Sequence, residues 1–209
     1  MRNETKEANM VDLSRRNLLK LTAAGLLGGA ATYVLPHPRS AHSAQTGTRG
    51  AKVLVVYYSR SGNTREIANQ IHERVGGDIV EIQTVEPYPE DYSAVTKQAQ
   101  QELNSGFKPP LKTKVENIGS YDVIFVGSPC WWSTVASPVR TFLSEYDLSG
   151  KVIAPFITHA GSGLGRSVAD IGTFCPDSTI PDGLAVWGTN AKTAQSEVAE
   201  WLRRLGVKE

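Results

Sequence analysis

The stretch VVYYSRSGNTREIA, residues 55–68, decides how this chain folds. It begins with β-branched and aromatic residues, which are typical of a strand buried on both faces. The small or polar residues 59–64 follow, and a helical pattern then places Ile67 and Ile71 one turn apart on the same face. The sequence therefore predicts a strand, a polar loop and a helix in close succession.

The rest of the chain repeats this alternation of strand and helix. Continuous or alternating apolar runs predict five strands, at residues 52–59, 78–85, 121–128, 151–158 and 183–188. Amphipathic segments predict five helices, at residues 64–75, 92–103, 137–146, 165–174 and 193–205. This alternation favours a single α/β domain, residues 50–209, with right-handed crossovers between parallel strands.

The polar loop has the composition of a phosphate site. Ser59, Ser61 and Thr64 offer hydroxyl groups, Asn63 offers an amide, and Gly62 leaves the backbone N–H groups accessible. The loop leads directly into a helix N-terminus, where unpaired N–H groups and the helix dipole favour an anion. It has neither the lysine of a nucleoside-triphosphate loop nor the glycine triplet of a dinucleotide fingerprint, so a single phosphate monoester fits it best. The alternative is that these residues only form a turn and a helix cap.

Two further polar loops follow the third and fourth predicted strands: SPCWWST at 128–134 and THAGSGLG at 158–165. In a parallel sheet the loops after the strands meet at one edge, where ligands bind. Trp131 and Trp132 can stack there on a flat ring, although one of them can equally pack in the core or at an interface. The glycines of the later loop allow its backbone to pass close to a ligand. A phosphate site, an aromatic stack and a glycine-rich edge together describe flavin mononucleotide (FMN).

Residues 50–209 resemble the flavodoxin family, and most closely its short members with a Ser-x-Ser-Gly-Asn-Thr loop. The segments GSPCWWSTVASPVRTFL and PFITHAGSGLGRSVADI carry the resemblance beyond that loop, although Cys130 beside the ring departs from the family pattern. The resemblance implies a flavodoxin-like three-layer sandwich, with a five-stranded parallel sheet of order 2-1-3-4-5 and one bound FMN. It also implies which residues hold the cofactor: Ser59, Arg60, Ser61, Gly62, Asn63, Thr64, Pro129, Cys130, Trp131, Trp132, His159, Gly161, Ser162 and Gly163.

The first 43 residues have the layout of an export signal rather than of a folded domain. The twin arginine Arg15–Arg16 precedes a modest apolar stretch, 18–35, which Pro36 and Pro38 end. The Ser-Arg-Arg-x-Leu-Leu-Lys core resembles the twin-arginine type of signal. We therefore expect the export machinery of that type as a partner, cleavage near residue 43 or 44, and work in the periplasm or elsewhere outside the cytoplasm. An uncleaved membrane anchor is the alternative.

Composition and cysteine positions exclude several other classes of function. The net charge is +1, and its small excess comes from the N-terminal segment, so nucleic acid is not an expected partner. No spacing of His, Cys, Asp or Glu predicts a metal site. Cys130 has Ala136, not arginine, six residues later, which excludes a cysteine phosphatase. Cys130 and Cys175 should lie at opposite edges of the sheet, so we expect two free thiols.

Two redox roles and one non-redox role remain open for the domain. We prefer an electron-transfer flavoprotein that acts between partner proteins, because the sequence shows no acid–base pair for an organic substrate. The alternative is an NAD(P)H-dependent FMN reductase of quinones or similar small acceptors. A binding protein that retains only the fold is the third. His159 either contacts the ligand or bonds backbone, and we name no catalytic residue.

Overall fold

The computed structural model describes residues 50–207, and its centre is a parallel sheet. The sheet order is β2-β1-β3-β5-β6, so the predicted order of the five parallel strands is confirmed. Each strand pairs in register with its neighbour; Tyr57 of the first strand, for example, lies opposite Gly127 of the third. The parallel strands are β1 (Val53–Tyr57), β2 (Asp78–Glu81), β3 (Val123–Trp131), β5 (Val152–His159) and β6 (Leu184–Trp187).

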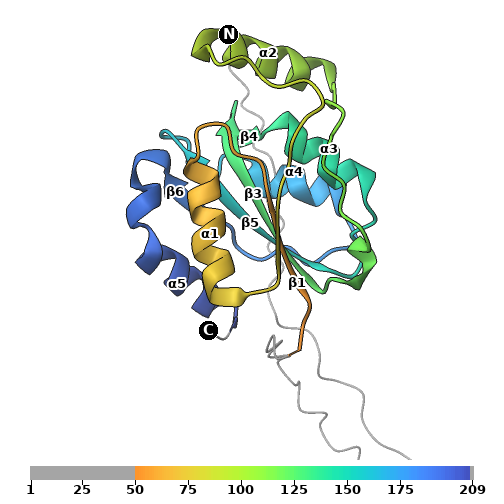
Figure 1. The fold of residues 1–209 in the computed structure, drawn as a ribbon, viewed down its shortest axis with the longest axis vertical. Coiled ribbons are helices and arrows are strands. Elements are labelled where there is room, and N and C mark those ends of the chain that lie inside the picture. Colours follow the sequence, from red (N-terminus) through yellow and green to blue (C-terminus); the bar gives the residue numbers. More distant parts are fainter. Residues whose placement is uncertain (1–49, 208–209) are drawn as a thin grey trace, which may run out of the picture. The chain divides into compact units, whose positions relative to one another are not determined.

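Helices cover both faces of the sheet, and one helix lies elsewhere. The pair α1 (Asn63–Val75) and α5 (Gln195–Arg204) lies on one face, and the pair α3 (Ser137–Glu145) and α4 (Ser167–Phe174) lies on the other (Figure 1). By contrast, α2 (Tyr92–Ser105) stands over the carboxyl edge of the sheet, near β4 (Figure 1). Two short 3-10 helices complete the chain, η1 (Ile118–Ser120) and η2 (Gly188–Thr193).

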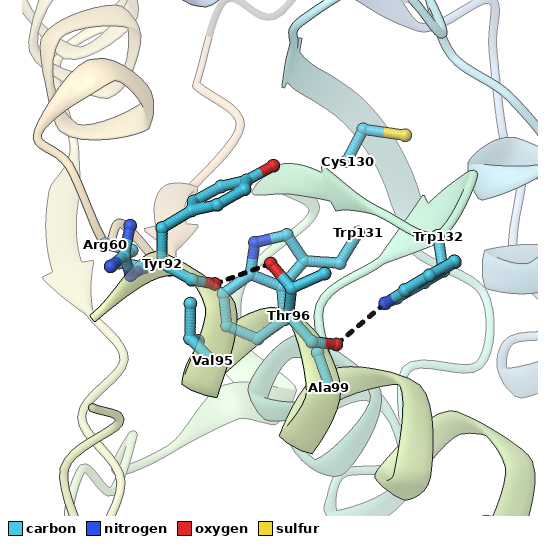
Figure 2. Close-up of a pocket in the computed structure, with 8 residues that line it drawn as sticks. All are labelled: Arg60, Tyr92, Val95, Thr96, Ala99, Cys130, Trp131 and Trp132. Atoms are coloured by element: carbon cyan, nitrogen blue, oxygen red, sulfur yellow. Dashed lines mark hydrogen bonds between the residues drawn. The ribbon is translucent and has the colours of Figure 1, made fainter. Parts of the chain in front are cut away.

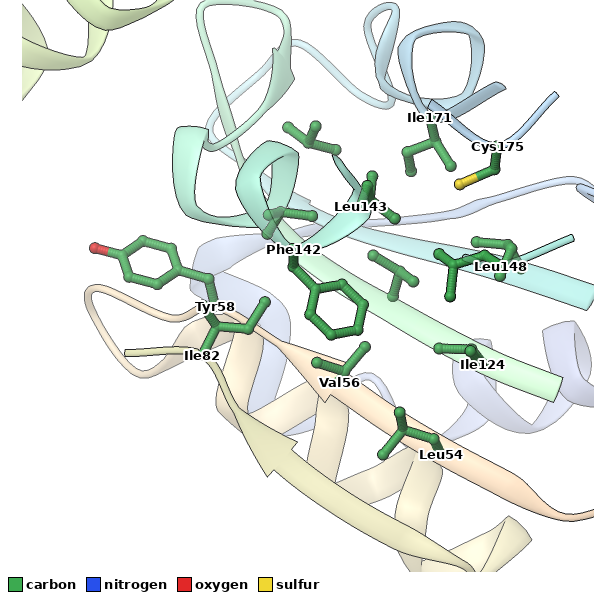
Figure 3. Packing of buried hydrophobic residues seen from close by; sticks show 14 of the residues in the cluster. Leu54, Val56, Tyr58, Ile82, Ile124, Phe142, Leu143, Leu148, Ile171 and Cys175 are labelled. Atoms are coloured by element: carbon green, nitrogen blue, oxygen red, sulfur yellow. The ribbon is translucent and has the colours of Figure 1, made fainter. Parts of the chain in front are cut away.

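Successive strand residues point to opposite faces, which divides the core into two clusters. On one face, Val53 and Val55 pack with α1 and with the fully buried Trp201 of α5. On the other, Leu54 and Val56 pack with Phe142 of α3 (Figure 3). These two layers of helices fix the sheet, and the sheet in turn positions the loops at its carboxyl edge.

Both cysteines are free, as predicted. Cys175 directly follows α4 and is buried in the second cluster, where burial raises the pKa of its thiol to about 11 (Figure 3). Cys130 lies near the end of β3 and is partly exposed. The two thiols therefore differ in accessibility, and only Cys130 can meet a ligand.

The segment expected as a loop after the third strand is instead a tight β-hairpin. β3 continues to Trp131, and β4 (Thr134–Val135) returns antiparallel to it, so that Trp131 pairs with Thr134. The two linking residues, Trp132 and Ser133, have positive φ values of 51° and 64°. Positive φ at both central residues is the signature of a type I′ turn, whose twist matches that of the strands. For residues with side chains this conformation costs about 1–2 kcal/mol each.

The predicted export signal, residues 1–43, lies outside the described residues and stays a prediction. Between residues 50 and 207, no helix combines the length and the apolar character that crossing a bilayer requires.

Candidate functional site

A pocket of about 350 Å³ lies at the carboxyl edge of the sheet. Its walls come from the loop after β1, from the carboxyl ends of β3, β5 and β6, and from the residues just after β5 and β6. This is the edge at which ligands bind in open parallel sheets, and the volume is typical of a pocket for an organic ligand. Half of the predicted cofactor residues line it: Arg60, Ser61, Asn63, Pro129, Cys130, Trp131 and His159.

The loop after β1 presents unpaired backbone donors. Gly62 caps α1 in the left-handed region, with φ 87°, and Ser59 Oγ accepts a hydrogen bond from the Arg65 N–H at 3.2 Å. The N–H groups of Asn63 and Thr64 have no hydrogen-bond partner within residues 50–207. Free N–H groups at the positive end of a 13-residue helix form an anion site. The loop therefore fits the predicted phosphate.

This loop lies close to β5 and to the segment after β6. The hydroxyl groups of Thr64 and Thr158 lie 2.8 Å apart, and both side chains are buried. The Thr64 side chain thus braces the loop against β5 and does not line the pocket. On the other side, a Cβ atom on Gly188 would lie 2.7 Å from Asn63 Nδ2. Glycine at 188 therefore leaves room for the Asn63 amide, and both residues line the pocket.

Trp131 forms one wall of the pocket and is held by two tyrosines. Its ring meets Tyr58 and Tyr88 edge to face, with centroids 5.6 and 5.1 Å away. The Tyr88 hydroxyl donates to the buried Glu102 at 2.6 Å. Burial raises the pKa of Tyr58 to about 12, and burial together with Glu102 raises the pKa of Tyr88. Both phenols stay protonated at neutral pH, so they act as rigid supports for the indole.

Trp132 does not line the pocket beside the phosphate loop, but it lines a second cavity. It lies at the tip of the hairpin, and its Nε1–H donates to the Thr96 carbonyl of α2 at 3.0 Å (Figure 2). Together with α2 it lines this second cavity, of about 270 Å³. Arg60, Tyr92, Cys130 and Trp131 line both cavities, which therefore adjoin. Of the two tryptophans predicted to contact a ring, the structure places Trp131 in the first pocket and Trp132 outside it.

The loop after β5 combines a ligand-facing residue with residues that support the wall. His159 lines the first pocket, and its Nδ1 accepts from the Gly161 N–H at 3.0 Å, which leaves the proton of the neutral ring on Nε2. The backbone bond, one of the two alternatives for His159, is thus present, and its contact with the ligand stays a prediction. Ser162 Oγ donates to Cys130 Sγ at 3.1 Å and so links this loop to β3. Gly161, Ser162 and Gly163 themselves lie outside the pocket lining.

A family model described as Flavodoxin matches residues 52–205. The chain belongs to the flavodoxin family. A candidate flavoprotein from Bacteroides eggerthii has a similar crystal structure, with 33% identity and a TM-score of 0.67 over 76% of this chain and 99% of that one. A flavoprotein from Lactobacillus acidophilus, solved in complex with FMN, shares the fold at 24% identity and a TM-score of 0.58, over 68% of this chain and 97% of its own.

Curated relatives include an NAD(P)H dehydrogenase (quinone) from Azorhizobium caulinodans. It is 34% identical over 120 residues, which are 53% of this chain and 57% of the relative. The chain thus spans about half the length of the curated relatives it matches.

The flavodoxin-family pocket also contains residues that we did not predict. Trp187 at the end of β6 and the next residues, Gly188 and Thr189, line it, and the Trp187 ring centroid lies 5.1 Å from that of His159. Their signal was present in the sequence GLAVWGTN, which offers the same residue types as the other loops after a predicted strand. Residues 50–207 contain no cluster of three His, Cys, Asp or Glu side chains that could hold a metal ion.

Proposed function

We propose that this protein is an FMN-dependent oxidoreductase that passes electrons to a small-molecule acceptor. The unpaired N–H groups at the start of α1 fit the phosphate of FMN. The indole of Trp131 offers a flat wall to its ring, and the pocket volume of about 350 Å³ suits an organic ligand. Membership of the flavodoxin family supports the same cofactor.

One observation favours a small acceptor: the cofactor pocket adjoins a second cavity. Such a cavity offers a small acceptor a place beside the cofactor, which transfer between partner proteins does not require. The name of the Azorhizobium relative, an NAD(P)H dehydrogenase (quinone), supports the same choice. We therefore place the reductase ahead of the carrier that the sequence favoured.

Bound FMN would supply the redox chemistry, and the protein supplies binding and orientation. The first N–H groups of α1 would bind the phosphate, with Asn63 and Ser61 beside it. Trp131 at the end of β3 and His159 at the end of β5 both line the pocket and would contact the ring. The His159 Nε2–H is a hydrogen-bond donor in the pocket wall when the ring is neutral.

A second candidate, an electron carrier between proteins, is favoured by the aromatic residues around the pocket mouth. Tyr92, Trp132 and Trp187 are large side chains that remain 74%, 44% and 50% exposed. Exposed aromatic residues are typical of protein interfaces. A partner protein that docked on them would cover the cofactor.

One assay separates the two candidates. We expect the purified, FMN-loaded protein to oxidise NADH or NADPH with a benzoquinone acceptor, anaerobically and over many turnovers, without a partner protein. Reduction by dithionite without turnover from NAD(P)H and quinone would instead support the carrier. A protein that binds no FMN would contradict both.

We also propose that the protein is exported after folding and works outside the cytoplasm. The support is the Arg15–Arg16 pair ahead of the apolar stretch. Replacing both arginines (Arg15→Lys, Arg16→Lys) is expected to retain the full-length protein in the cytoplasm, as cell fractionation and immunoblotting would show. The matched control, Arg39→Lys, keeps the pair and should be exported normally. Export of the double variant would refute a signal of this type.

A further inference from the structure

The second cavity has its own walls, although it adjoins the cofactor pocket. Val95, Thr96 and Ala99 of α2 form one side, and none of them lines the cofactor pocket (Figure 2). The Trp131 and Trp132 rings come from the hairpin (Figure 2). The lining is therefore mostly apolar and includes two indole rings.

The hairpin that carries Trp132 has a strained turn, and this turn positions the Trp132 indole at the cavity. Trp132 and Ser133 occupy the left-handed positions of a type I′ turn, where Asn and Gly are the usual residues. Such strained positions cluster at ligand sites, because the surrounding structure must hold them in place. Here the strained tip positions an indole across the cavity, and its bond to the Thr96 carbonyl fixes it against α2.

Arg60 provides hydrogen-bond donors at the border between the two cavities. One of its Nη atoms donates to the Glu90 carbonyl, and its guanidinium lies 6.0 Å from the centre of the Tyr92 ring. Its Nε is buried and has no hydrogen-bond partner in the part of the chain that the structure describes. Protein atoms cover this Nε, so a ligand in the cavity does not reach it. The donors open to a ligand are the remaining Nη hydrogens of Arg60, a residue that lines both cavities.

We infer that this cavity is a separate site for the electron acceptor and that it takes a small quinone. The apolar side chains and indoles fit a flat, uncharged ring, and the Arg60 donors fit a quinone carbonyl oxygen. A volume of about 270 Å³ accommodates one or two rings. The cavity is thus suited to a small, flat acceptor.

This inference rests on the proposed function for its electrons. Reduction of a quinone to a hydroquinone takes two electrons and two protons. FMN in the neighbouring pocket, once reduced by NAD(P)H, would supply the two electrons, and solvent would supply the protons. The site itself can nevertheless be tested without turnover, through binding alone.

Equilibrium dialysis of duroquinone (tetramethyl-1,4-benzoquinone) against the oxidised, FMN-loaded protein tests the site. Every ring carbon of duroquinone is substituted, so it does not alkylate the Cys130 thiol. We expect saturable binding at one site. Thr96→Phe fills the cavity and should weaken that binding at least about tenfold, while FMN affinity stays the same. The matched control Gln100→Phe, at an exposed position of the same helix, should stay within about twofold of the wild type.

A ligand comparison tests the role assigned to Arg60. 1,2,4,5-Tetramethylbenzene has the same ring and methyl groups but no carbonyl oxygen, so it should bind about tenfold more weakly than duroquinone. Equal binding of the two ligands would overturn the carbonyl contact. Equal duroquinone binding by Thr96→Phe and Gln100→Phe, or none by the FMN-loaded wild type, would overturn the site. Failure of the wild type to bind FMN would overturn the proposed function instead.

Discussion

Ser61→Glu is expected to weaken FMN binding at least tenfold and to leave the domain folded. Ser61 is exposed, lines the cofactor pocket and lies just before Gly62, the cap of α1. A carboxylate there is favourable for the helix, since it meets the positive end of the dipole. It would, however, occupy the place of the phosphate and repel it. Loss of one charge-assisted hydrogen bond costs about 1.5–3 kcal/mol, and 1.4 kcal/mol is a factor of about ten.

Ser61→Gln is the matched control, because glutamine has the size of glutamate without its charge. Quenching of FMN fluorescence during titration with the apoprotein gives the affinity of each variant, and circular dichroism confirms the fold. We expect the glutamine variant to bind much more tightly than the glutamate variant. The same affinity for both would mean that the phosphate does not lie at the start of α1. That result would remove the basis for placing FMN in this pocket.

The fold could be predicted from the sequence because its main signals are local. The strands 121–128 and 151–158 read as continuous apolar runs, and both are central strands in the structure. A central parallel strand is buried by helices on both faces, so its sequence does not alternate. The order of the strands, by contrast, came from the resemblance, since apolar runs do not say which strand lies beside which.

The hairpin at 131–134 could not be predicted, because its turn lacks the usual residues. Trp132 and Ser133 stand where Asn and Gly are expected, so turn chemistry gave no signal. The position of α2 could not be predicted from the sequence either. Val95 and Ala99 form a narrow apolar stripe, which indicates a buried side but not the surface against which it packs.

The pocket residues could be predicted where they follow a strand in the sequence. They could be predicted less well where they depend on contacts between loops. Ser61 and Asn63 follow a strand directly and line the pocket. Thr64 belongs to the same loop, but its hydroxyl pairs with Thr158, a contact between distant segments. Gly188 lies next to Asn63, which is far from it in the sequence, and only the fold brings the two residues together. Such contacts depend on tertiary packing, so the local pattern does not contain them.

Gly127→Ala is expected to lower the free energy of unfolding by about 3 kcal/mol, the upper end of the usual cost of overpacking. Gly127 lies in β3 between Tyr57 of β1 and Phe156 of β5. A Cβ atom at this position would lie 2.2 Å from Phe156 Cζ and 2.7 Å from Tyr57 Cβ. Phe156 is fully buried, so its ring has no free space into which to move. The strand itself must shift, and it carries the hairpin that walls both cavities.

Gly119→Ala is the matched control for Gly127→Ala, because a Cβ atom at Gly119 meets no other atom within 4 Å. Its free energy of unfolding, measured by urea denaturation, should stay within about 0.5 kcal/mol of the wild type. Adding Phe156→Leu to Gly127→Ala shortens the clashing side chain and should recover part of the loss. If Gly127→Ala were as stable as Gly119→Ala, the ring of Phe156 could not lie over Gly127 as the structure places it. If the double variant were no more stable than Gly127→Ala alone, the clash would lie with Tyr57 and the strand backbone instead.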